Sequence, residues 1–231
     1  MLSQIGFFAH THGFFCEGVY YPVEAAMVHI ESESSFLITI DANEINFTER
    51  DIKCNDRLTK DTHQIPFPFI GALPIEKARA FINQKYHEKD LGKGCLVACK
   101  DAEQEFFFKS CEIPVININS IFSKDKPRLG ILLPQYLYPF PDCSIHINGK
   151  CEMCCRRIAF VFAKFIKEKN EEELWENEKK LIQHDDVPII ESFEPYKSLI
   201  EINLKKAIEN KQNVKIEFNG TNLNLNFSAI Q

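Results

Sequence analysis

The stretch VEAAMVHIESESSFLITI, residues 23–40, decides the expected fold. Two apolar runs, 23–30 and 35–40, flank the polar tetrapeptide ESES, and each run has the length of a buried strand. The pattern predicts a hairpin. An earlier apolar run, IGFFA at 5–9, predicts another short strand before it.

After this hairpin the chain alternates between helical and strand patterns. Residues 41–74 are rich in loop signals, with three prolines. The elements that follow are expected to be a helix over 75–86, a strand over 94–99, a helix over 101–111, a strand over 113–118 and a buried helix over 155–169. A hairpin followed by alternating helices and strands predicts an α/β protein with a mixed sheet flanked by helices. The RNase H-like fold is one that satisfies this description.

The composition changes after residue 169. The stretch 170–186 predicts a charged helix, 196–210 predicts another helix, and 213–227 alternates like a hairpin with an Asn-Gly turn. We therefore expect a main domain over 1–169 and a small helical and hairpin extension over 170–231, packed on the main domain or separate from it.

The overall composition is typical of a globular protein, with 45% apolar residues and a net charge of −6 in 231 residues. No run approaches the roughly 18 apolar residues of a membrane span, and the N-terminus lacks the basic region of a signal peptide. Nine cysteines without such a signal indicate a reducing compartment, with thiols free or metal-bound. Because the chain is acidic, any face that binds nucleic acid must be local.

The stretch DCSIHINGKCEMCC, 142–155, has the character of a metal site. Cys143 and His146 are separated by two residues, a spacing that lets two good zinc ligands converge. A third ligand would be Cys151, Cys154 or Cys155, and tetrahedral zinc needs a fourth from elsewhere. Two other interpretations stay open: the thiols are small buried hydrophobic groups, or Cys-x-x-Cys at 151 and 154 is a redox pair.

The first strand ends in AHTH, so His10 and His12 stand where an RNase H-like exonuclease carries two acids. Imidazoles are poor ligands for Mg²⁺, and Asp101 alone does not hold two metals. A ribonuclease with an altered centre at His10, His12, Asp101 or His63 remains the alternative. A further enzyme hypothesis pairs Cys16 as nucleophile with His63 as base.

Three stretches together resemble the Maelstrom domain, an RNase H-like family of the piRNA pathway. They are PVEAAMVHI (22–30), THQIP (62–66) and YPFPDCSIHINGKCEMCCRRIAF (138–160). The resemblance implies a DnaQ-type exonuclease fold that has lost its acidic centre. It also implies a structural zinc ion held by Glu24, Cys143, His146 and Cys151, with Cys154 as the alternative. Glu24 has a separate argument, since a carboxylate in an apolar strand is costly to bury unless it is paired or bound to a cation.

The same resemblance implies binding of single-stranded RNA and of proteins of the small-RNA silencing pathway, which represses transposons in the germline. It implies a location in the nucleus and in perinuclear granules of the cytoplasm. Family members often carry an HMG box, and this chain has none, so DNA binding is not expected. The candidate RNA contacts are Arg156, Arg157 and Lys164 on the predicted helix after the metal loop, and His63.

Overall fold

The computed structural model describes residues 2–122, 127–136, 145–146, 153–183, 214–218 and 221–225, with side chains described as far as residue 176. The chain divides into two compact units, Met1–Glu176 and Asn177–Gln231. This division lies near the boundary expected at residue 169. In the second unit, strands β6 (Val214–Phe218) and β7 (Thr221–Leu225) pair antiparallel within the stretch expected to form a hairpin.

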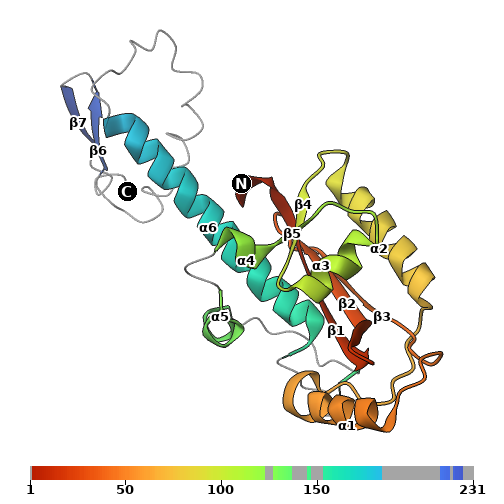
Figure 1. Ribbon diagram of the computed structural model, residues 1–231. Coiled ribbons are helices and arrows are strands. Elements are labelled where there is room, and N and C mark those ends of the chain that lie inside the picture. The colour runs from red at the N-terminus through yellow and green to blue at the C-terminus, as the bar shows by residue number, and fades with distance from the viewer. Residues whose placement is uncertain are drawn as a thin grey trace, which may run out of the picture. The chain divides into compact units, whose positions relative to one another are not determined.

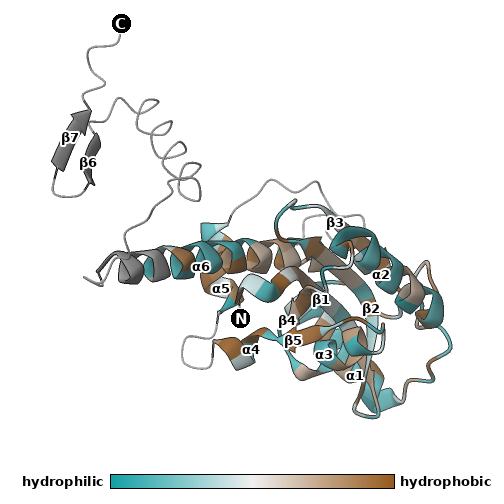
Figure 2. Ribbon diagram, turned by 90° about the horizontal axis from the view of Figure 1, so that it is seen from above, coloured by the Kyte–Doolittle hydropathy of each residue, from teal (hydrophilic) through white to brown (hydrophobic). Residues whose placement is uncertain are grey.

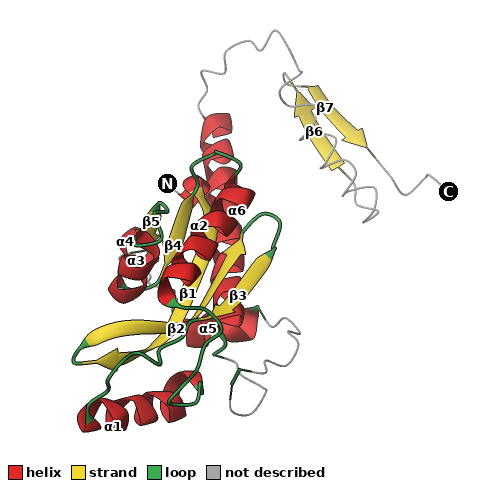
Figure 3. Ribbon diagram, turned by 90° about the vertical axis from the view of Figure 1, so that its right-hand side faces the viewer, coloured by secondary structure: helices red, strands yellow, loops and turns green. Residues whose placement is uncertain are grey.

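The first unit is built on a five-stranded sheet with the order β3-β2-β1-β4-β5 (Figure 1). The strands are β1 (Ile5–Cys16), β2 (Val19–His29), β3 (Ser35–Thr39), β4 (Leu96–Cys99) and β5 (Val115–Asn117). Strands β1, β2 and β3 form an antiparallel meander, and β4 and β5 run parallel to β1. This mixed sheet with flanking helices has the strand order and directions of the RNase H-like fold, so the expected fold class is confirmed (Figure 3).

The helices differ from the expectation in several places. They are α1 (Glu49–Leu58), a π-helical turn (Thr59–His63), α2 (Ile75–Asp90), α3 (Ala102–Lys109), α4 (Ile118–Ile121), α5 (Leu129–Gln135) and α6 (Cys155–Gln183), after a short 3₁₀ turn at Leu2–Gln4. Helix α1 lies in a region expected to be loop. Helix α6 is continuous where two helices were expected, because its charged second half contains neither glycine nor proline to end it.

The two faces of the sheet carry separate cores. Side chains alternate along a strand, so Phe8, Ala26 and Val28 face α6, while Phe7 and Met27 belong to the core under α2 and α3. Figure 1 shows α6 on one side of β1 and β2, with α2 and α3 on the other. In Figure 2 hydrophobic residues follow the strands, whereas α2 is mostly hydrophilic.

A β-bulge interrupts the pairing of β1 with β2 just after His12. A side chain at Gly13 would meet the backbone oxygen of Tyr21 at 2.2 Å, so the close approach of the two strands requires glycine. Before the bulge, His12 pairs directly with Glu24. The bulge therefore shifts the register of the two strands next to the point where the His12 and Glu24 side chains face α6.

Candidate metal centre

The centre is built around Glu24, which is fully buried in the middle of the sheet. Its neighbours two and four positions along β2, Ala26 and Val28, pack in the α6 core, so the carboxylate points to the same face. His12 lies opposite it on β1, and His10 lies two residues earlier on the same face. These side chains project beyond the carboxyl end of β4, which pairs with β1 only as far as Phe8. That is the end at which open α/β sheets bind ligands.

The start of α6 brings Cys154 and Cys155 to Glu24. The backbone N–H of Cys155 donates to Oε2 of Glu24 at 3.3 Å, and the Cys154 thiol donates to Oε1 at 3.9 Å. The unpaired N–H groups at a helix N-terminus favour a nearby anion. The start of α6 is thereby fixed against a strand more than a hundred residues earlier in the chain.

His146 completes the first cluster. Its Nε2 lies 3.5 Å from Oε2 of Glu24, and both side chains are fully buried. The ligand atoms of Glu24, His146 and Cys154 all lie within 4.8 Å of one another. Of the predicted zinc ligands, the structure thus brings together Glu24, His146 and the alternative cysteine, Cys154; Cys143 and Cys151 lie outside the described residues. A carboxylate, an imidazole and a thiol are a donor set suited to zinc.

Electrostatics favour an anionic Glu24 beside a neutral His12. Burial raises the pKa of the Glu24 carboxyl, but hydrogen bonding to His146 and attraction to His12 and His146 outweigh burial, so its pKa lies below the usual value. Burial lowers the pKa of His12, and Glu24 offsets only part of that shift. An ionised carboxylate and a neutral imidazole are the protonation states that bind a cation.

A second cluster lies beside the first. Ligand atoms of His10, His12 and Cys155 also fall within 4.8 Å of one another, and all three residues are buried. The rings of His10 and His12 meet edge to face with their centroids 4.9 Å apart. Burial, with a smaller contribution from His12, lowers the pKa of His10 well below its usual value. Sequence reasoning noticed each of these residues but did not group them.

The residues of the alternative enzyme hypotheses have other partners. Asp101 caps α3, because its carboxylate accepts the backbone N–H of Gln104 at 3.1 Å. Within the described ranges, Glu24 is the one carboxylate in the two clusters. Burial and the nearby Asp51 raise the pKa of the Cys16 thiol, and this thiol donates to the backbone oxygen of Asn46 at 3.4 Å. These features do not support an activated cysteine nucleophile.

Three of the candidate RNA contacts lie half-buried on α6, and the fourth, His63, is buried. Arg156 and Arg157 are half-buried in the first turn of α6. Lys164 forms an ion pair with Glu33, and its ammonium lies 5.4 Å from the centroid of the Phe160 ring. His63 is 1% exposed and its ring lies 5.3 Å from that of His12, a position that does not support direct contact with RNA.

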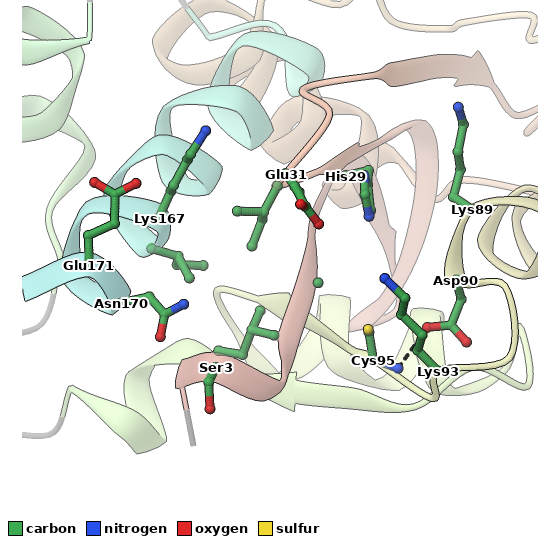
Figure 4. Close-up of a pocket in the computed structure, with 14 residues that line it drawn as sticks. Ser3, His29, Glu31, Lys89, Asp90, Lys93, Cys95, Lys167, Asn170 and Glu171 are labelled. Atoms are coloured by element: carbon green, nitrogen blue, oxygen red, sulfur yellow. Dashed lines mark hydrogen bonds between the residues drawn. The ribbon is translucent and has the colours of Figure 1, made fainter. Parts of the chain in front are cut away.

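A cavity of about 350 Å³ lies at the opposite end of the sheet, where β1 and β4 begin (Figure 4). Its lining mixes positive side chains, such as Lys89 and Lys93, with negative ones, such as Glu31. Asp90 also lines it, but its carboxylate accepts the backbone N–H groups of Gly94 and Cys95 at 2.7 Å each. The mixed charge favours no particular class of ligand.

Comparisons with known proteins add little to this geometry. No family model matches the chain, and no curated protein matches it. Among solved structures, the chain is similar to the Neurospora crassa Pan2 catalytic unit (protease and nuclease domain), with 16% identity and a TM-score of 0.41 over 76% of this chain. The match spans 29% of that chain, and a likeness at this level carries no functional argument.

None of the helices in the described ranges combines the length and apolar character needed to cross a membrane. The centre described above is therefore characterised by its own residues: an RNase H-like sheet with a buried cluster of carboxylate, imidazole and thiol groups that could bind a metal ion.

Proposed function

We propose that this chain is a zinc-stabilised, Maelstrom-like domain that binds single-stranded RNA or protein partners in piRNA-directed silencing of transposons and lacks an acidic exonuclease centre. The observation that carries the proposal is the convergence of Glu24, His146 and Cys154. The resemblance to the Maelstrom domain implied a zinc ion linking the second strand to the cysteine-rich loop and helix. These three residues come from those same segments.

The proposed zinc ligands are Glu24, Cys143, His146 and Cys154, with Cys154 now preferred to Cys151. Cys154 is preferred because its thiol lies beside the Glu24 carboxylate. A zinc ion held by four protein side chains has no open position for substrate, so it would contribute folding energy rather than chemistry. The ligands would hold β2 against the start of α6.

The lack of exonuclease chemistry is supported by the residues on β1. His10 and His12 occupy the sheet face where metal-binding acids are expected, and imidazoles are poor ligands for Mg²⁺. Asp101 is engaged as a helix cap. An RNase H-like fold without these acids can still hold RNA through basic side chains, and Arg156 and Arg157 are the proposed contacts.

Binding of a fluorescent single-stranded RNA by the full chain, measured over a salt series, tests the proposal. We expect affinity at low salt that falls as salt is raised, and a shallower salt slope by about 1 for each contacting arginine that is replaced. Arg156→Gln and Arg157→Gln are the test variants. Lys109→Gln, in an exposed ion pair on the opposite face of the sheet, is the matched control.

Two outcomes would reject the RNA-binding domain. No affinity at low salt would favour a domain that binds only proteins. Cleavage of the RNA by wild type that is lost in His10→Ala would favour the alternative function, a ribonuclease with an altered centre, for which the buried pair of imidazoles is the supporting feature.

A further inference from the structure

We propose that His10, His12 and Cys155 form a second metal site, separate from the Glu24 cluster, that binds a zinc ion. Two imidazoles and a thiol are soft and borderline ligands that zinc prefers. Their ligand atoms already lie within 4.8 Å of one another. In tetrahedral zinc sites, bonds of about 2.0–2.3 Å separate ligand atoms by about 3.3–3.8 Å. Side chains would therefore close by roughly 1 Å around the ion.

His12 makes the kind of hydrogen bond that supports a metal-bound imidazole. Its Nε2 lies in a short hydrogen bond with the backbone oxygen of Met153. A carbonyl oxygen can only accept, so Nε2 carries the proton, and in the neutral ring the lone pair is on Nδ1. Metal-bound histidines almost always donate their second ring nitrogen to such a carbonyl or to a carboxylate. The structure thus supplies the supporting hydrogen bond that fixes this ring.

His10 has one unpartnered ring nitrogen in the described part of the chain, although the Gln104 side chain lies close enough to the ring to raise its pKa slightly against burial. Its Nδ1 is buried, and among the described residues it has no hydrogen-bond partner. Buried polar atoms are nearly always hydrogen-bonded, because leaving one without a partner costs free energy. Coordination to a metal ion would satisfy this nitrogen, and the ring already lies against that of His12.

Cys155 supplies the anionic ligand. Its side chain is fully buried, and its Sγ makes a long contact of 3.7 Å with the backbone oxygen of Glu24. Zinc displaces the proton of a coordinating thiol, so the thiolate would partly neutralise the buried dication. The adjacent Cys154 belongs to the other cluster, so the Cys-Cys pair at the start of α6 faces two different ligand sets. Three protein ligands leave a fourth position, which a water molecule would take.

The test is the zinc content of the full chain, measured by elemental analysis after loading with zinc and removal of the excess. Wild type should hold two ions per chain, His10→Ala one, and Glu24→Gln one. Cys54→Ser, which replaces an exposed thiol, is the control and should leave the content unchanged. Circular dichroism of each variant checks that it is folded.

Cobalt loading gives a second readout, because a thiolate bound to cobalt produces a charge-transfer absorption. His10→Ala and Cys155→Ser should each lose part of this absorption. One ion in wild type and one in His10→Ala would overturn the second site and leave the zinc of the proposed function intact. One ion in wild type, none in His10→Ala and one in Glu24→Gln would support the second site and reject the first. Where His10→Ala does not fold, Cys155→Ser takes its place in both measurements.

Discussion

Replacing Glu24 by glutamine should lower the free energy of unfolding in the presence of zinc and change it little in the presence of a chelator. The change keeps the size of the side chain and removes its charge. In the metal-free chain the carboxylate has the Cys155 backbone N–H at 3.3 Å, His146 at 3.5 Å and the Cys154 thiol at 3.9 Å. All three distances are longer than the usual hydrogen-bond lengths, so each contact is weak by itself, but together with the attraction to His12 they offset burial.

The expected magnitude follows from these contacts. A hydrogen bond to a charged group contributes about 1.5–3 kcal/mol, and removing a carboxylate from water costs several kcal/mol. Without metal the two nearly cancel, so Glu24→Gln should unfold within about 1 kcal/mol of wild type. With free zinc at about 1,000 times its dissociation constant, the ion adds about 4.1 kcal/mol to wild type. The variant loses an anionic ligand and should be about 2–4 kcal/mol less stable than wild type under these conditions.

The assay is urea unfolding of the full chain followed by circular dichroism, with zinc and with chelator. Glu76→Gln is the matched control, because Glu76 is 77% exposed and pairs only with Arg79 at the surface. It should change the free energy of unfolding by less than about 0.5 kcal/mol in both conditions. If Glu24→Gln lowers the free energy of unfolding by the same amount with zinc and with chelator, Glu24 is not a zinc ligand.

Three further predictions concern the fold. Phe162→Ala removes an α6 ring that is fully buried against the sheet and should lower the free energy of unfolding by about 3–5 kcal/mol. Phe106→Ala is the control for this prediction, because the Phe106 ring is 78% exposed, and it should change the free energy of unfolding by less than about 0.5 kcal/mol in the same measurement. Thr48→Ala removes the N-cap of α1 and should cost about 0.5–2 kcal/mol, with faster amide hydrogen exchange in α1 as the local readout. Burial raises the pKa of the Asp90 carboxyl, but hydrogen bonds from two backbone N–H groups outweigh burial and leave its pKa below the usual value. The ionised Asp90 carboxylate therefore stabilises the fold fully above its unfolded pKa of about 3.9, and this contribution is lost as the pH falls below that value. The free energies of unfolding of wild type and Asp90→Asn should consequently converge in acid.

The strands could be predicted because buried strands are short apolar runs, but their ends could not. Strand β1 was expected over 5–9 and extends to Cys16. His10 and His12 resemble a strand end in sequence, because histidine is seldom fully buried. Their burial depends on α6, which covers that face from far along the chain.

Helix α1 was missed although the sequence carries its start signal. Thr48 and Asp51 form a capping box, in which each side chain accepts the backbone N–H of the other residue. The prolines of 41–74 and the low apolar content of the helix favoured a loop. The apolar residues of this region instead pack under the far end of the β1–β2 hairpin, where Phe14 and Ile65 share a small core.

The candidate cluster of Glu24, His146 and a cysteine was expected from the Maelstrom resemblance, but the choice among the cysteines could not be made from spacing. Which thiol faces Glu24 depends on the residue at which α6 begins and on the direction of its first turn. That start lies at Cys155, so Cys154 precedes the helix and lies beside the carboxylate. The grouping of Cys155 with His10 and His12 depends on the same turn, which sequence spacing does not define.

The contact between Glu24 and Cys155 joins positions 131 residues apart, and this separation affects synthesis on the ribosome. At about 5–20 residues per second, Cys155 is added roughly 7 to 26 seconds after Glu24. During that interval the nascent sheet exposes the face that carries Phe8 and Val28, because the helix that covers it has not been made. Chaperones that bind exposed apolar strands would therefore meet this chain before α6 emerges.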